Sequence, residues 1–228
     1  MSSDKPLISV VIPALNEAET ISQVIREVVQ YTPYPDSTEI IVVDGGSEDG
    51  TQNFVLENGA KLIIEPRRGY GRAIRTGLEN VNGEVIVIVD ADGTYEVSDM
   101  PKLVEPLLKD KADVSLAARI GGKILPGAMP RFNYVGNCIF TWLYNKLYKQ
   151  EISDTQTGFR ALTRKALAAI KLVEEDMAIS TEILTKAAKE KLRIIELPST
   201  YKHRVGKPKL KRFKAGRDIL RTLFFDLL

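Results

Sequence analysis

The sequence predicts an α/β domain built on a doubly wound, mostly parallel sheet. The first hundred residues alternate short apolar runs with segments of helical periodicity, the pattern of strands joined by crossover helices. The runs 7–12 and 84–89 are apolar almost throughout, as expected of strands buried on both faces. With 44% hydrophobic residues in a chain of 228, the protein can bury a core, which excludes wholesale disorder.

The elements are expected in the following order. A strand over 7–12 leads to a helix over 16–31, because Asn16 and Glu19 have the spacing of an N-cap and its partner. Further strands are expected over 39–43, 61–64, 84–89 and 113–117, with helices over 50–57, 71–80 and 98–109. The last helix of this series is capped by Ser98.

The regular alternation of strands and helices ends after Arg119. A Gly/Pro-rich loop over 121–130 precedes an aromatic helix over 131–149, a strand over 158–163, a helix over 181–191, a strand over 193–198 and a terminal helix over 213–228. No repeat or low-complexity linker divides the chain. We expect one domain over 1–200, followed by a basic segment and an amphipathic C-terminal helix over 201–228.

Charge is divided unevenly along the chain. Residues 1–113 hold 10 Lys/Arg against 20 Asp/Glu, whereas residues 114–228 hold 22 against 10. The basic half suggests an anionic partner or surface. The single cysteine, Cys138, excludes a disulfide framework and cysteine zinc clusters. No apolar run approaches the ~20 residues of a spanning helix, and the N-terminus lacks the apolar stretch of a signal peptide. A cytoplasmic protein is therefore expected.

Polar residues follow three of the expected strands, at 13–17, 44–47 and 90–92. Ligands of open α/β sheets bind beyond the carboxyl ends of the strands. Asp90 and Asp92 stand two residues apart on extended backbone, so they project to the same side. Such oxygen ligands can share a Mg²⁺ or Mn²⁺ with a diphosphate. The alternative is that they cap the turn that follows.

Other motifs exclude other sites. The G-x-G at 69–71 follows the third strand and lacks the third glycine of a dinucleotide-binding fingerprint. His203 is the only histidine, which excludes a His-rich zinc site and a His–His acid/base pair.

Several stretches resemble the family 2 inverting glycosyltransferases, whose nucleotide-sugar domain has a GT-A fold. They are VVIPALNEAETI, IIVVDGGSEDGT, EPRRGYGRAIRTGL and VIVIVDADGTYEVSDMPKLVEPL. Within that family, LAARIGGKILPGAMPRFNYVGN and ISDTQTGFRALTRKAL are similar to the polyprenyl-phosphate hexose synthases of the dolichyl-phosphate mannose synthase type. The resemblance implies a metal-dependent, inverting transfer of a hexose from a nucleotide-diphosphate sugar to a polyprenyl (dolichyl) phosphate.

The resemblance also implies a donor site. Its expected residues are Pro13, Ala14, Asn16 and Glu17 around the nucleoside, Asp44 at the base or ribose, and Asp90, Ala91 and Asp92 at the diphosphate. Asp90 and Asp92 would hold Mg²⁺ or Mn²⁺, with Asp92 as the direct ligand. The DGGSEDGT and SDTQTGFRA stretches favour a UDP-hexose slightly over GDP-mannose. Two positions depart from the pattern: Thr94 replaces a metal-contacting Gln of mannose synthases, and Tyr70 replaces a Lys of many relatives.

The basic half supplies the expected phosphate contacts. The resemblance places Arg119, Arg131, Arg160, Arg204 and Lys209 at the acceptor phosphate or the donor diphosphate, and arginine forks suit phosphate oxygens. Asp92, Arg119, Arg131 and Asp154 form the expected catalytic set, in which Asp154 orients an arginine or the donor sugar, with a role as catalytic base as the alternative. The alternative for each cation is a surface salt bridge.

Together with the C-terminal helix, the expected helix over 131–149 predicts a membrane contact. It holds six of the 16 aromatic residues of the chain, and no acid occurs from 114 to 150. A polar stripe recurs every four positions on it: Asn133, Asn137, Thr141, Asn145 and Lys149. Such a helix can lie beside anionic lipid, which would make the protein peripheral on the inner face of the membrane. The alternatives are burial in the core or in a homodimer interface.

Two rival functions remain open. A family 2 glycosyltransferase acting on a sugar hydroxyl needs a carboxylate base, for which Glu175, Asp176 and Glu182 are candidates. A nucleic-acid-binding protein would use the basic segment 202–217, but only His203 and Phe213 could stack on bases there. We therefore expect no nucleic-acid partner.

Overall fold

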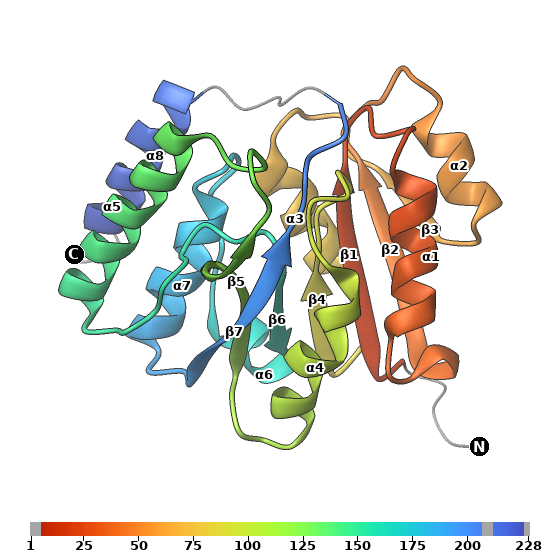
Figure 1. The fold of residues 1–228 in the computed structure, drawn as a ribbon. Coiled ribbons are helices and arrows are strands. Elements are labelled where there is room, and N and C mark those ends of the chain that lie inside the picture. Colours follow the sequence, from red (N-terminus) through yellow and green to blue (C-terminus); the bar gives the residue numbers. More distant parts are fainter. Residues whose placement is uncertain (1–5, 207–211, 226–228) are drawn as a thin grey trace.

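The computed structural model describes residues 6–206 and 212–225. A seven-stranded sheet, in the order β3-β2-β1-β4-β6-β5-β7, lies between two layers of helices (Figure 1). The strands are β1 (Ile8–Ala14), β2 (Thr38–Asp44), β3 (Lys61–Ile64), β4 (Val85–Ile88), β5 (Val114–Ile124), β6 (Arg160–Thr163) and β7 (Ile194–Tyr201). The helices are α1 (Ile21–Tyr31), α2 (Thr51–Glu57), α3 (Tyr70–Glu79), α4 (Met100–Leu108), α5 (Arg131–Tyr148), α6 (Arg164–Ala169), α7 (Ile179–Lys189) and α8 (Arg212–Phe225).

The apolar core has two parts, one on each face of the sheet. On one face α1 and α4 pack on β1 and β4, with Val24 and Met100 in the same buried cluster as Val10. On the other face α3 and α7 pack on the sheet, and α8 lies beside α5 and α7 (Figure 1). Because both faces are covered, the central strands are apolar on both sides, which explains their unbroken apolar runs.

The parallel strands bring three polar ends together. Strand β1 pairs in parallel with β2 on one side, where Ala14 lies opposite Asp44, and with β4 on the other, where Val11 lies opposite Ile88. The chain runs outward from β1 to β3 and then returns to β4 on the far side of β1. The sheet therefore has its switch point between β1 and β4, where open α/β sheets bind ligands.

The second half of the sheet has two features that the sequence did not indicate: the direction of β6 and the length of β5. Strand β6 runs antiparallel to both β4 and β5, so the sheet is mixed there. Strand β5 continues to Ile124 and includes part of the expected loop. Gly122 explains this, because a Cβ at that position would lie 2.2 Å from the carbonyl oxygen of Ser199 on β7. Only glycine permits such a close approach of the two strands.

Two expected helix starts are wrong. Helix α1 begins at Ile21, since Asn16 adopts a left-handed backbone (φ 50°) and its side chain accepts from the Glu48 N–H instead of capping the helix. Helix α4 begins at Met100, and the Ser98 hydroxyl donates to Glu96. The short helix α6 was not expected; the Thr163 hydroxyl caps it by accepting from the Ala166 N–H at 3.0 Å.

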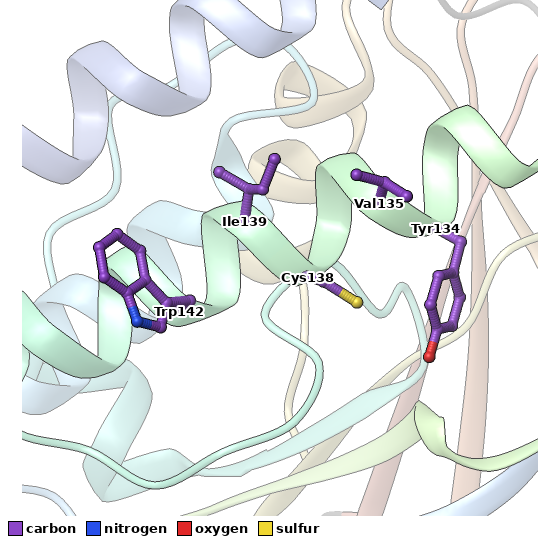
Figure 2. A pocket seen from close by; sticks show the side chains of 5 residues that line it. All are labelled: Tyr134, Val135, Cys138, Ile139 and Trp142. Carbon is purple, nitrogen blue, oxygen red and sulfur yellow. The ribbon is translucent and has the colours of Figure 1, made fainter.

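Helix α5 turns its polar stripe inward. Thr141 is buried and hydrogen-bonded to Thr155, and Asn145 donates to the carbonyl of Ile152 at 2.8 Å. An apolar face points outward instead: Phe132, Val135, Ile139 and Trp142 are 54–67% exposed. Figure 2 shows Val135, Ile139 and Trp142 on successive turns of α5, where they line a shallow hollow of about 280 Å³ with Tyr134 and Cys138. Tyr144 and Thr141, on the inner side of α5, are buried, so the helix packs against the core on one side while this face stays exposed.

The described part of the chain contains no helix with both the length and the apolar character needed to cross a membrane.

Candidate active site

The turn after β4 carries the two expected metal carboxylates. Asp92 is 5% exposed and accepts through one oxygen from the backbone N–H and the hydroxyl of Thr94, at 3.1 and 2.6 Å. Its other oxygen accepts from Arg204 at 2.6 Å. Both oxygens of Asp92 are therefore engaged, one by its own turn and one by a cation from the far end of the chain.

Asp90 is held differently. The Tyr70 hydroxyl, from the start of α3, donates to one oxygen of Asp90 at 2.6 Å. The other oxygen lies against Gly158, where an added Cβ would stand 2.2 Å away. Burial, followed by the charge of Asp92, raises the pKa of Asp90 to about 6. The sequence marked Tyr70 only as a departure from relatives; its contact with Asp90 appears only in the folded chain.

Arg204 joins the turn that follows β4, residues 90–94 (the Asp turn), to the loop that follows β1. It lies just after β7, and its guanidinium donates to Asp92 and, at 2.9 Å, to Glu17. Its Nε is buried and has no hydrogen-bond partner among the described residues. The backbone N–H of Lys202 donates to the Thr94 carbonyl at 2.7 Å, which fixes this segment beside the turn.

The loops at the ends of β1 and β2 contain residues that the resemblance implied around the nucleoside. Asp44 is fully buried, and one of its oxygens accepts from the N–H groups of Gly46 and Ser47 and from Gln52, at 2.9–3.0 Å. The Asn16 N–H donates to the Ser47 hydroxyl at 2.7 Å. Asp44 and Asn16 thus tie the two loops together, which shapes this side of the site.

One cavity of about 470 Å³ connects these parts. Its walls come from the end of β1, the start of α3, the Asp turn, the loop before α7, and α8. They include Arg204, Arg68, Asp176 and Lys214, together with six of the predicted donor residues: Pro13, Ala14, Glu17, Asp90, Ala91 and Asp92. The sequence did not predict that α8 forms a wall of the site, because the position of α8 depends on its packing against α5 and α7.

The comparisons identify the family. The profile of glycosyl transferase family 2 matches residues 9–170, which run from β1 to the end of α6. The chain belongs to glycosyl transferase family 2.

Several relatives of the chain have names that agree with this family. A dolichyl-phosphate hexose transferase of Haloferax volcanii is 33% identical over 218 residues, which cover 95% of this chain and 92% of the relative. The low-salt glycan biosynthesis hexosyltransferase Agl6 of the same organism is 36% identical over 213 residues. The chain spans about half the length of Agl6, 51%.

Solved structures agree in fold. Glucosyl-3-phosphoglycerate synthase from Mycobacterium tuberculosis, in complex with Mn²⁺, UDP and glucosyl-3-phosphoglycerate, gives a TM-score of 0.75. The match covers 97% of this chain and 80% of that one at 21% identity. The GT-A fold expected from the sequence is confirmed.

Arg119 and Asp154 form a buried ion pair in the glycosyltransferase. Two guanidinium nitrogens of Arg119 donate to the two Asp154 oxygens at 2.7 and 2.9 Å, and the Arg119 N–H adds a third bond at 3.0 Å. The guanidinium also lies 5.3 Å from the ring centre of Tyr201. Burial alone would raise the pKa of Asp154, but the charge and hydrogen bonds of Arg119 hold it below its usual range. Asp154 thus orients Arg119, one of the two roles that the resemblance implied for it.

Other predicted cations lie elsewhere. Arg160 is 1% exposed and donates to the backbone carbonyls of Ser180 and Thr157. Arg131 begins α5, is exposed and does not line the cavity described above. Arg119, Arg131 and Arg160 therefore do not line the cavity, whereas Arg204 does. Lys209 lies outside the described residues.

The three candidate bases have separate positions. Glu182 is fully buried and accepts from the N–H groups of Val173 and Glu174 at 2.8–3.1 Å, so it fixes the loop before α7. Glu175 pairs with Arg72. Asp176 lines the cavity and pairs with Lys214 of α8. Only Asp176 of the three stands where a substrate would bind.

The carboxylates suit a divalent cation. Within residues 6–206 and 212–225, no three His, Cys, Asp or Glu side chains converge on one point. Asp92 and Glu17 nevertheless already hold one cation between them, the Arg204 guanidinium. Carboxylate oxygens are the ligands that Mg²⁺ and Mn²⁺ prefer, with the remaining positions filled by phosphate and water. The donor set fits such an ion, because Asp90, Asp92 and Glu17 all line the cavity.

Proposed function

We propose that this glycosyltransferase transfers a hexose from a nucleoside diphosphate sugar to a polyprenyl phosphate, in one inverting displacement. The observation that carries the proposal is the single cavity that joins the carboxyl ends of β1 and β4 to α8. A donor would occupy the strand ends, with its diphosphate beside Asp90 and Asp92. The acceptor phosphate would enter from the side of α8, whose neighbour α5 presents the apolar face.

The acceptor needs cations rather than a base. A phosphate monoester has a second pKa of about 6, so its oxygen is already anionic at pH 7. That oxygen would bond to the anomeric carbon while the carbon–oxygen bond to the diphosphate breaks, and the nucleoside diphosphate leaves with the electron pair. Repulsion between the two phosphate groups must be offset. Arg68, Arg204 and Lys214 line the cavity and can supply the positive charge.

A divalent cation completes this arrangement. Asp92, with Asp90 and Glu17 nearby, would hold Mg²⁺ or Mn²⁺, and the ion would neutralise charge on the leaving diphosphate. The names of the relatives support the acceptor class. The synthase complex with Mn²⁺ and UDP suggests, by fold alone, which ligands to test first.

Asp176 favours a second candidate, transfer to a sugar hydroxyl, because it is a carboxylate in the cavity wall. We expect Asp176→Asn to lower transfer to polyprenyl phosphate by less than about tenfold, whereas loss of a general base costs about 10²–10⁴-fold. The assay uses UDP- and GDP-hexoses with Mg²⁺ or Mn²⁺, and compares polyprenyl phosphate with simple glycosides as acceptors. Glu175→Gln, at the neighbouring acid paired with Arg72, is the matched control. Transfer to a glycoside that depends on Asp176 would establish the hydroxyl-acceptor function instead.

The outward face of α5 supports attachment to a membrane surface. Its four most exposed apolar residues follow one side of the helix, and the sequence from 114 to 150 contains no acid that would repel anionic lipid. Aromatic and aliphatic side chains beside basic residues are the composition of helices that lie in the headgroup region. Such attachment would bring the cavity close to a lipid acceptor. A homodimer through the same face is the alternative.

Flotation with liposomes tests this attachment. The wild-type protein should float with vesicles that contain anionic lipid at low salt, and the double variant Phe132→Ser/Trp142→Ser should stay at the bottom of the gradient. The matched control is Val29→Ser/Leu56→Ser, which removes two apolar side chains of 53 and 59% exposure from α1 and α2. Equal flotation of both variants, or none by the wild type, would refute the membrane role of α5. A dimer that the α5 variant converts to monomer would assign this face to self-association.

A further inference from the structure

Arg204 is the one cationic side chain that bridges the two strand ends of the described site. It touches Asp92 at 2.6 Å and Glu17 at 2.9 Å, and its side chain is 30% exposed. The segment that carries it is fixed to the turn at Thr94. Asp92 has its other oxygen on Thr94, so the oxygen that faces Arg204 is the one left for any incoming cation.

We infer that, when no nucleotide is bound, Arg204 holds the place of the divalent cation beside Asp92 and gives it up only when the donor's diphosphate arrives. Arg204 thereby sets the order of binding: the metal binds with the nucleotide and only weakly alone. This inference rests on the proposed function, because it assumes that Asp92 is the metal carboxylate.

The exchange follows from the partners available to each cation. Without a nucleotide, a metal ion at Asp92 would push the guanidinium away from both carboxylates and leave it in a half-buried position without an anion. Its Nε already lacks a partner there, and an unpaired buried donor is costly. With a diphosphate present, the displaced guanidinium gains phosphate oxygens that match its fork. The metal, the diphosphate and Arg204 can then all be paired at once.

Direct titration of Mn²⁺ tests this inference without any transfer reaction. Free Mn²⁺ is measured by electron paramagnetic resonance in the presence of wild-type protein or Arg204→Gln. If Arg204 pairs with Asp92 about nine-tenths of the time, Arg204→Gln should bind Mn²⁺ alone about tenfold more tightly than the wild type. Adding UDP or GDP should tighten Mn²⁺ binding to the wild type much more than binding to the variant, because linkage between the two ligands now passes through Arg204.

Two further variants separate site occupancy from simple charge. Lys202→Gln removes one positive charge two residues from Arg204 without freeing Asp92, since the Lys202 side chain pairs with Glu96 and does not line the cavity; it should change Mn²⁺ affinity by less than about twofold. Arg204→Lys keeps the charge but loses the fork that spans two carboxylates, so its affinity should fall between the wild type and Arg204→Gln. Circular dichroism confirms that each variant is folded.

The outcomes are distinct. Equal Mn²⁺ affinity of the wild type and Arg204→Gln without nucleotide would overturn the exchange and leave the proposed function standing. An equal gain from Lys202→Gln would likewise overturn it, because the effect would then be charge alone. Failure of Mn²⁺ to bind any of these proteins, even with UDP or GDP, would overturn the metal-dependent function together with the exchange.

Discussion

Changing Asp92 to asparagine should lower kcat/KM for hexose transfer by about two to three orders of magnitude, the usual cost of losing one group that stabilises developing charge. Asp92 is 5% exposed and lies where the diphosphate is expected. Asparagine keeps an oxygen that can accept from Thr94, but it lacks the negative charge that would hold a divalent cation and pair with Arg204. The loss should therefore be chemical and not structural.

Steady-state kinetics at saturating Mn²⁺, together with urea unfolding, check this prediction. The unfolding midpoint should change little, because Arg204 keeps its pair with Glu17 and its side chain is 30% exposed, so water can reach the guanidinium. Thr94→Val is the matched control: it removes one hydrogen bond that a neutral hydroxyl donates to Asp92 and leaves the carboxylate charge, so it should cost less than about tenfold. Near-normal transfer by Asp92→Asn, or full wild-type activity in a chelator, would refute the metal role.

The sequence predicted the part of the fold that local pattern determines. The unbroken apolar runs identified β1, β2 and β4, and the rule that ligands bind at carboxyl strand ends placed Ala14, Asp44 and Asp90 at one edge. The antiparallel β6 escaped prediction because an apolar run carries no information on strand direction. The length of β5 depends on Gly122 against Ser199, which is a contact between distant segments.

The site shows the same division. Residues that immediately follow a strand could be located from sequence, whereas residues that act through tertiary contacts could not. Glu182 looked like a candidate base, yet it is buried and holds backbone N–H groups of its own loop. The polar stripe of α5 had the correct spacing, but only the contacts of Thr141 and Asn145 reveal that it faces inward. Burial decides such questions, and burial is a property of the folded chain.

Asp154→Asn should lower the free energy of unfolding by about 3–5 kcal/mol, the cost of removing one member of a buried ion pair. Asp154 is fully buried and Arg119 is 8% exposed, so water cannot solvate the guanidinium once the carboxylate is gone. Asparagine keeps an acceptor for the Arg119 N–H, which limits the change to the charge. Urea unfolding at pH 7 measures the loss. Glu105→Gln, in the exposed Glu105–Lys109 pair, should leave the unfolding midpoint unchanged.

The double variant Arg119→Met/Asp154→Asn separates the structural role of this pair from a catalytic one. Removing both charges leaves no unpaired ion in the interior, so more than half of the stability lost in Asp154→Asn should return. If Arg119 also contacts a substrate phosphate, as the resemblance to polyprenyl-phosphate hexose synthases implies, this stable double variant will still be inactive. If it instead transfers hexose at the wild-type rate, Arg119 only supports the fold, and the cations that screen the acceptor must be those that line the cavity, Arg68, Arg204 and Lys214.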